Sequence, residues 1–233
     1  MKPEPNAIRH SPPSHPKGAK EQQESSLRLV AWETTRNCNL ACIHCRASAT
    51  CGPYEGELDT RASLRLLDEI AQVGKPIVIL TGGEPLLRAD IFDLARHGTE
   101  LGLRMVMACN GTLVDDTIAR KIANAGIKRI SVSLDGSTAE THDKFRGVPG
   151  AFEGALRGLE NAKKTGIEFQ INTTITKANL KQIPNILDLA VKLGAVAHHI
   201  FLLVPTGRGK YIIDKAINAA EYEETLNWFY DQR

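Results

Sequence analysis

The chain has 233 residues, 42% of them hydrophobic, and a formal net charge of +2 from 29 basic and 27 acidic side chains. This length suffices for one sizeable hydrophobic core, and the balanced charge gives no strong field to attract nucleic acid or anionic lipid, so we expect a small-molecule partner. The sequence has no apolar run near the roughly 20 residues of a membrane helix and no charged-then-apolar secretion signal, so we expect a cytoplasmic protein.

The predicted elements begin after a polar N-terminal segment. Residues 1–26 are rich in proline, serine and charge, a composition that cannot offset the entropy of ordering, so we expect a disordered tail. From residue 27 onward, short β-branched or apolar runs alternate with helical patterns, which is typical of βαβ units with a parallel sheet. The expected strands are 28–33, 76–80, 103–108, 128–134, 168–175 and 198–204, and the expected helices lie near 60–73, 90–100, 115–125, 151–164 and 179–193.

This alternation predicts an α/β fold, either an open doubly wound sheet or a partial barrel. Glycines that fit helix C-caps follow several of the helices, at Gly74, Gly126, Gly166 and Gly194. In both folds the carboxyl ends of the strands carry the functional site. Polar and glycine-rich segments follow or end successive strands, at 37–46, 81–85, 109–112, 133–136, 172–174 and 205–209. We therefore expect these segments to converge on one face.

Three of the five cysteines lie within eight positions, in the pattern Cys38-x3-Cys42-x2-Cys45. They are too close in sequence to link distant segments by disulfides, so a metal in a reducing compartment is the better interpretation. Three thiolates do not fill a four-coordinate site. Either His44 completes a Cys3His zinc site, although its side chain would tend to point away, or a [4Fe–4S] cluster keeps one iron open for an exogenous ligand.

The cysteine pattern after the first strand, together with Gly82-Gly83-Glu84-Pro85 after the second, resembles the radical S-adenosylmethionine superfamily. The resemblance runs from about residue 27 to at least residue 210. It implies a partial (β/α)6 barrel, a [4Fe–4S] cluster on Cys38, Cys42 and Cys45, and S-adenosylmethionine as the second cofactor. In that family the unique iron chelates the methionine group, and reductive cleavage gives a 5′-deoxyadenosyl radical that removes a substrate hydrogen.

The resemblance also points to candidate cofactor-binding residues whose chemistry suits the role. Glu84 offers an acceptor for the methionine ammonium, Arg146 a bidentate partner for its carboxylate, and His44 a main-chain contact to adenine. For each position a local turn, cap or surface charge is the alternative interpretation. The full candidate set is His44, Gly82, Gly83, Glu84, Pro85, Asn110, Ser133, Asp135, Arg146 and Asn172.

Other singled-out residues have less specific expectations. Cys51 and Cys109 are interpreted as packed thiols. Alternation sends His198 and His199 to opposite faces of a strand, so at most one points into a barrel. Arg208 and Lys210, in a glycine-rich loop near the barrel mouth, either pair with substrate carboxylates or are solvated loop charges.

Residues 30–49, 133–152 and 198–210 resemble the narrower family of S-adenosylmethionine-dependent haem synthases. This resemblance implies oxidative decarboxylation of two propionates of Fe-coproporphyrin III to the vinyls of haem b, with an electron donor as partner. A radical enzyme that modifies a peptide or another tetrapyrrole and a zinc-stabilised binding module remain alternatives. We expect the barrel over residues 27–220 and, at 221–233, the start of a C-terminal extension that is truncated here, because such relatives usually carry a second cluster there.

Overall fold

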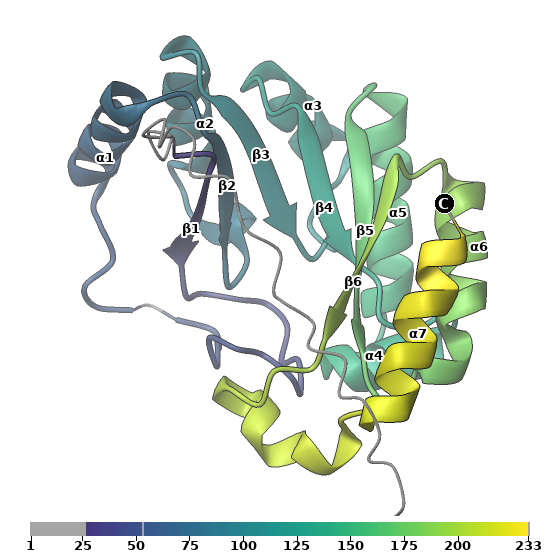
Figure 1. Cartoon of the computed structure of the whole chain (residues 1–233). Helices are drawn as coiled ribbons and strands as arrows, with labels where there is room; N and C mark the ends of the chain where they lie inside the picture. Colours follow the sequence, from purple (N-terminus) through teal and green to yellow (C-terminus); the bar gives the residue numbers. More distant parts are fainter. Residues whose placement is uncertain (1–26, 53, 233) are drawn as a thin grey trace, which may run out of the picture.

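The computed structural model describes residues 27–52 and 54–232, so the predicted disordered tail lies outside the described residues. A single curved sheet organises this part of the chain (Figure 1). Its strands are all parallel and pair in the order β1-β2-β3-β4-β5-β6. They are β1 (Leu29–Thr35), β2 (Ile77–Gly82), β3 (Arg104–Cys109), β4 (Arg129–Ser133), β5 (Glu168–Ile175) and β6 (Ala197–Leu202), each overlapping a predicted strand.

The two faces of the sheet differ in chemistry because successive side chains of a strand alternate between them. One set of residues, which includes Val78, Leu80, Met105, Met107 and Ile130, is fully buried in the main hydrophobic core with residues of the flanking helices. The alternate set is only partly buried. The helices therefore cover one face and leave the other face for the site.

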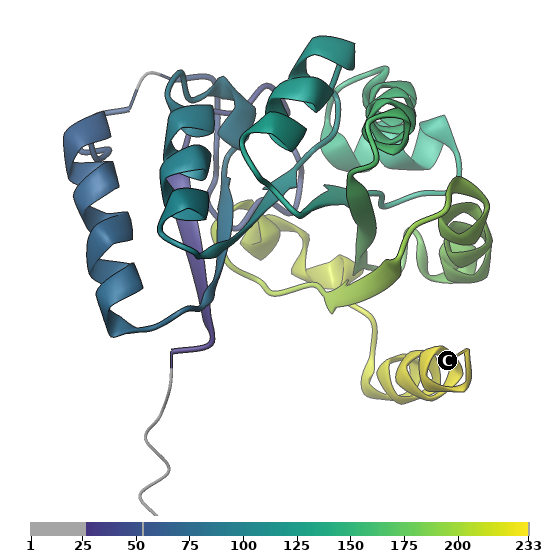
Figure 2. The same cartoon turned by 90° about the horizontal axis from the view of Figure 1, so that it is seen from above.

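The partial barrel is confirmed and the doubly wound sheet is wrong. A doubly wound sheet has a point where the strand order reverses, with helices on both sides, whereas here each strand pairs with the next one along the chain. Seen from above, the strands follow an arc with helices α1, α2, α3, α5 and α6 outside it (Figure 2). The inner face of the arc is therefore open to ligands.

The helices agree with the predictions except in two places. Helix α4 was not predicted, because its sequence is mostly polar, although Thr138 caps its start and the left-handed Gly147 ends it. The helix predicted from residue 179 is divided, because Pro184 lies in the first turn of α6 and a short 3-10 helix precedes it. The observed helices are α1 (Thr60–Val73), α2 (Ile91–Glu100), α3 (Asp116–Asn124), α4 (Ala139–Arg146), α5 (Ala151–Lys164), α6 (Ile183–Leu193) and α7 (Ala219–Asp231), with 3-10 helices η1 (Pro85–Leu87), η2 (Leu180–Gln182) and η3 (Gly207–Lys215).

The helices of the described part of the chain include none that is long and apolar enough to cross a lipid bilayer.

Candidate functional site

A pocket of about 350 Å³ opens on the inner face, at the carboxyl ends of the strands. Pockets of this size commonly hold small ligands in proteins. Several of its strand-borne lining residues are polar, because many inward positions near the strand ends carry hydroxyl, amide and carboxylate groups. The lining includes Glu33, Thr81, Ser131, Ser133, Asn172 and Thr174.

All three motif cysteines line this pocket. They belong to the cysteine loop, defined here as residues 36–58, which connects β1 to α1. Cys38 and Cys42 are buried, and Cys45 is half-buried beside them. The pKa of the Cys38 thiol is raised to about 11, mainly by burial and in part by the nearby Cys42, Glu84 and Cys45, whereas the Leu40 N–H acts to lower it. A cation is therefore needed to hold the Cys38 thiol as a thiolate at neutral pH.

The glycine pair after β2 anchors the start of the cysteine loop. The Gly83 N–H donates to Thr35 O over 2.7 Å, and the Glu84 N–H donates to Asn37 O over 2.8 Å. A Cβ on Gly82 would lie 2.2 Å from Thr35 O, and one on Gly83 would lie 2.3 Å from Asn37 O. The close approach that the glycines permit is therefore an approach of the chain's own backbone, next to a pocket that both glycines line.

The end of α4 supports the middle of the loop. The Ala41 and Ile43 N–H groups donate to the carbonyls of Arg146 and Phe145 over 3.1 and 3.0 Å. Gly147 has φ +71°, and a Cβ there would lie 2.5 Å from Ala41 O. The left-handed glycine that ends α4 thus also lets the helix end contact the cysteine-bearing segment.

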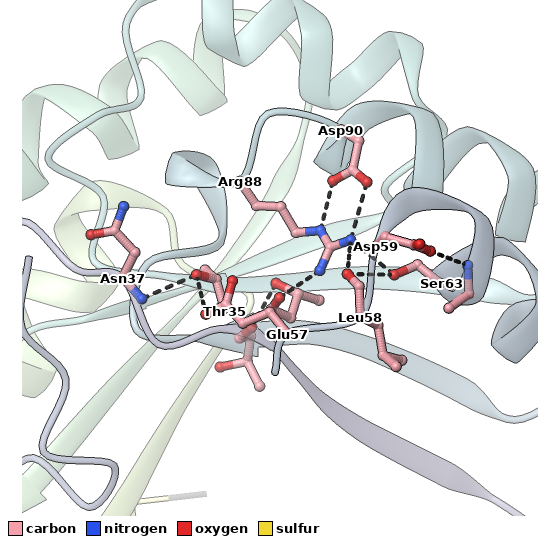
Figure 3. A network of polar contacts seen from close by, with 11 residues as sticks. Thr35, Asn37, Glu57, Leu58, Asp59, Ser63, Arg88 and Asp90 are labelled. Carbon is pink, nitrogen blue, oxygen red and sulfur yellow. Dashed lines mark hydrogen bonds and ion pairs between the residues drawn. The ribbon is translucent and has the colours of Figure 1, made fainter. Parts of the chain in front are cut away.

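Arg88 joins the two ends of the cysteine loop, as Figure 3 shows. Its guanidinium donates to Thr34 O over 2.7 Å and to Leu58 O over 2.9 Å, and Asp90 pairs with it. On the same side, Glu57 accepts hydrogen bonds from the Thr35 hydroxyl and the Arg36 N–H. Neither Arg88 nor Glu57 was predicted from the sequence, because the atoms that each of them bonds in β1 and the cysteine loop are distant along the chain.

Arg208, from η3, holds the loop from the far edge of the sheet. Its Nε donates to Cys42 O over 2.7 Å and its Nη1 donates to Ala49 O over 2.6 Å. The interpretation of Arg208 as a solvated loop charge is therefore wrong. Lys210 is exposed, and its ammonium lies 4.9 Å from the centre of the Tyr211 ring.

We predict that Arg208→Ala accelerates loss of the metal cofactor without unfolding the chain. Each hydrogen bond from a charged donor contributes on the order of 1.5–3 kcal/mol, so losing two should speed the opening of the loop by at least about tenfold. The rate of iron release to a chelator measures this. Lys210→Ala is the matched control and should release iron at the wild-type rate. Equal rates for Arg208→Ala and wild type would contradict the anchoring role.

Arg146 brings a buried positive charge to the cysteines. Its Nη1 lies 3.5 Å from the Cys42 sulfur, and its Nη2 forms an ion pair with the fully buried Asp135. Burial acts to lower the pKa of the guanidinium, but Asp135 and Cys42 beside it raise that pKa overall. Its Nε is buried without a hydrogen-bond partner in the described part of the chain. Arg146 also lines the pocket, so its guanidinium brings a positive charge to the pocket wall.

Glu84 is fully buried and is not among the residues that line the pocket. Its two carboxylate oxygens accept from the Asn110 N–H over 2.7 Å and the Leu86 N–H over 3.1 Å. Asn110 does line the pocket, and its side-chain oxygen accepts from Thr112 while its amide donates to Asn39. Glu84 therefore fixes a pocket-lining residue through its backbone.

Burial raises the pKa of Glu84 to about 7, although the Asn110 and Leu86 N–H groups act to lower it. When the pKa of an acid is higher in the folded than in the unfolded protein, its protonation stabilises the fold. This stabilisation is complete below the pKa of the unfolded state and is lost as the pH rises through the pKa of the folded state. The shift corresponds to a loss on the order of 3 kcal/mol between about pH 4.5 and pH 7.

We predict that Glu84→Gln removes this pH dependence from the cofactor-free protein. The glutamine leaves one of the two N–H groups unsatisfied, so the variant should also lose about 1–3 kcal/mol at pH 5. Urea unfolding at pH 5 and pH 8 measures both effects, and Glu100→Gln, on the exposed end of α2, is the control. If wild type and Glu84→Gln change in parallel with pH, the raised pKa is contradicted.

The other candidate residues divide between the pocket and its support. Ser133, Asn172 and His44 line the pocket, whereas Pro85 and Asp135 are buried behind it. The His44 ring packs on Phe145 with centroids 4.3 Å apart. Burial lowers the pKa of His44 to about 2, helped by Arg146 and Arg208, so its imidazole is neutral, and its buried Nδ1 has no hydrogen-bond partner in the described residues.

The remaining singled-out residues lie as follows. Cys51 is exposed, so its interpretation as a packed thiol is wrong, whereas Cys109 is buried at the end of β3, where it also lines the pocket. His198 packs edge-on against Phe229 of α7, outside the barrel. His199 pairs in register with the pocket-lining Asn172, so it is the inward one of the two histidines.

A family profile decides which class of protein this pocket belongs to: the profile of the Radical SAM superfamily matches residues 32–190. The chain belongs to the radical SAM superfamily. Members of this superfamily are enzymes that bind a [4Fe–4S] cluster and S-adenosylmethionine, which confirms the two predicted cofactors at the level of the family.

The similar curated proteins are longer than this chain. The chain is 54% identical to a protein named AdoMet-dependent heme synthase from Oleidesulfovibrio alaskensis, over 91% of this chain and 55% of that protein. It is 50% identical to one of the same name from Nitratidesulfovibrio vulgaris, over 95% and 60% of the two chains. The chain thus spans little more than half the length of these radical SAM relatives.

Two solved structures share the fold of this chain. Streptococcus suis SuiB bound to S-adenosylmethionine matches with a TM-score of 0.74 and 19% identity, over 89% of this chain and 48% of SuiB. Native anSMEcpe with bound AdoMet matches with a TM-score of 0.63 and 20% identity, over 76% and 52% of the two chains.

The residues present fit a radical SAM cluster better than a single ion. Among residues 27–52 and 54–232, no three His, Cys, Asp or Glu side chains form a group that could hold one metal ion. A [4Fe–4S] cluster binds each thiolate through a different iron, so its three cysteines surround a volume instead of meeting at a point. The thiols of Cys38, Cys42 and Cys45 around one pocket match that requirement, and His44 is packed on Phe145.

Proposed function

We propose that this chain is the radical SAM domain of a haem synthase that oxidatively decarboxylates two propionates of Fe-coproporphyrin III to the vinyls of haem b. The observation that carries the proposal is 50–54% identity to proteins named AdoMet-dependent heme synthase over 88–95% of this chain. Identity falls to 40% for a protein named Fe-coproporphyrin III synthase and to 37% for one named Pre-heme d1 synthase.

When bound, the cluster and S-adenosylmethionine supply an electron and a 5′-deoxyadenosyl radical for hydrogen abstraction. In our proposal the thiolates of Cys38, Cys42 and Cys45 hold the cluster. Arg146 donates to the Cys42 sulfur and brings its positive charge to the cofactor carboxylate. The other proposed cofactor contacts come from His44, Gly82, Gly83, Asn110, Ser133 and Asn172 at the pocket wall, supported from behind by Glu84, Pro85 and Asp135.

The substrate is proposed to lie beyond the cofactor on the open side of the inner face. Phe201 and Val204 line the pocket and are 50% and 60% exposed, so an apolar macrocycle would bury them. Lys210 is free to pair with a carboxylate of the substrate, whereas Arg208 acts by holding the cysteine loop. An electron-donor protein and a reducing cytoplasm complete the proposal, because the thiolates must stay unoxidised.

Anaerobic reconstitution followed by assay with Fe-coproporphyrin III and S-adenosylmethionine tests the function. We expect monovinyl and divinyl products together with 5′-deoxyadenosine, with an electron acceptor added. The control replaces Fe-coproporphyrin III by a short cysteine-containing peptide, which should not be modified. Modification of the peptide, or of another tetrapyrrole alone, would contradict the proposal in favour of the alternative radical enzymes, and a colourless zinc protein would contradict the whole class.

A further inference from the structure

His199 presents an imidazole to the open part of the inner face. Its register partner in β5 is Asn172, which lines the pocket, so the two side chains leave the sheet on the same side and about 5 Å apart. His199 is exposed, whereas the adjacent His198 turns the other way, bonds to the buried Thr173 hydroxyl over 2.8 Å and packs on Phe229. Nothing in the cofactor pocket described above uses the His199 ring.

The ring of His199 is oriented by a neighbouring amide. Its Nδ1 lies 3.2 Å from the amide nitrogen position of Gln170, which also lies 3.0 Å from Asn172 Oδ1. The oxygen and nitrogen of a side-chain amide can be exchanged without moving any heavy-atom position. When the amides of both Gln170 and Asn172 are exchanged in this way, Gln170 Oε1 accepts a hydrogen bond from the His199 Nδ1–H. The imidazole then presents Nε2 as a free lone pair. Within the described part of the chain, Nδ1 makes the only hydrogen bond of this ring.

This arrangement is that of a metal-ligating histidine before the metal arrives. Such a histidine donates the N–H of one ring nitrogen to a fixed acceptor, which sets the tautomer and the ring orientation, and binds the metal through the other nitrogen. In the described residues His199 belongs to no group of three His, Cys, Asp or Glu side chains that could hold a metal ion, so further ligands would have to arrive with the metal. An iron porphyrin brings four nitrogens and takes an axial imidazole.

We propose that His199 Nε2 is an axial ligand of the iron of the porphyrin substrate, with Gln170 as its positioning residue. The proposal rests on the proposed function, since it assigns a contact to the iron-porphyrin substrate. It places the macrocycle beside the cofactor pocket: Phe201 lies two residues further along the same strand, is 50% exposed and lines that pocket. The iron, and not only the carboxylates, then selects the substrate and fixes its position.

The test is a binding titration of the anaerobic 233-residue protein with ferric coproporphyrin III and, separately, with metal-free coproporphyrin III. His199→Ala should weaken binding of the iron porphyrin by at least about tenfold and leave the metal-free affinity unchanged. The Soret band and the EPR g values of the iron porphyrin bound to His199→Ala should differ from those of the wild-type complex, and added imidazole should restore the wild-type spectrum.

Two further variants test the ligand and its positioning. His199→Met keeps a side chain of similar bulk, and its complex with the iron porphyrin should have a shifted Soret band. Gln170→Glu should lower the reduction potential of the bound iron, because a carboxylate makes the imidazole a stronger donor.

Two controls test coordination by histidines away from the inner face. His97, on α2, pairs with Asp68 away from the inner face, and His97→Ala should behave as wild type. A double replacement of His10 and His15 by alanine covers the N-terminal histidines. A wild-type spectrum and affinity in His199→Ala would overturn the axial ligand while leaving the haem synthase proposal intact. Absence of iron-porphyrin binding by the wild type, with or without cofactors, would overturn both.

Discussion

Replacing Cys42 by alanine is expected to abolish the iron–sulfur cluster and all S-adenosylmethionine cleavage. Cys42 is buried, lines the pocket and lies against Arg146, so its loss leaves a buried guanidinium next to a vacant cluster ligand. Cys38→Ala and Cys45→Ala should have the same effect on the cluster. Iron and sulfide analysis after anaerobic reconstitution, with the visible absorption of the product, measures the loss.

Cys51→Ala is the matched control for this experiment. Cys51 lies in the same loop but is exposed, so the variant should reconstitute as wild type does. Cys109→Ala removes a buried thiol and tests packing without removing a proposed ligand. An unchanged iron and sulfide content in Cys42→Ala would remove the basis for the cysteine assignment.

The second prediction with a large expected effect concerns the electron that the substrate releases on decarboxylation. We expect the reconstituted and reduced 233-residue chain to cleave S-adenosylmethionine to 5′-deoxyadenosine but to form little haem b without an added acceptor. Loss of CO2 from a propionate radical releases one electron for each vinyl group formed, and that electron needs an acceptor. Of the five cysteines, Cys51 and Cys109 remain after the motif, one exposed and one buried, too few for the ligands of a second cluster.

Both products are quantified in one anaerobic reaction, with and without an artificial one-electron acceptor. The ratio of haem b to 5′-deoxyadenosine should rise when the acceptor is present. Efficient multiple-turnover formation of haem b by this chain alone would show that the electron accounting is wrong.

The strands were predictable because each is a short β-branched or apolar run bounded by turn residues. Alternation within those runs also separates the buried face of Met105 and Met107 from the inner face of Ser131 and Asn172. Helix α4 was missed because hydrophobic periodicity is weak there. The signals that could have found it were the capping Thr138 and the terminal Gly147.

The support of the cysteine loop was beyond the reach of sequence patterns. Arg208 bonds to carbonyls 166 and 159 residues away along the chain, and a carbonyl acceptor leaves no mark on residue type. Gly82 and Gly83 were candidates for contacts to the cofactor, but only the fold reveals that the backbone of Thr35 and Asn37 lies against them. Likewise, alternation predicted that His198 and His199 oppose each other, whereas the register with Asn172 was needed to say which one faces inward.

The central claim is that Cys38, Cys42 and Cys45 hold one cluster with an iron open to S-adenosylmethionine in the inner-face pocket. The most direct measurement is the EPR spectrum of the reduced, reconstituted protein before and after addition of S-adenosylmethionine. The account predicts a [4Fe–4S]⁺ signal whose g values shift when the cofactor is added, because the open iron gains ligands. A spectrum unchanged by saturating S-adenosylmethionine, or a protein that binds zinc in place of iron and sulfide, would contradict it.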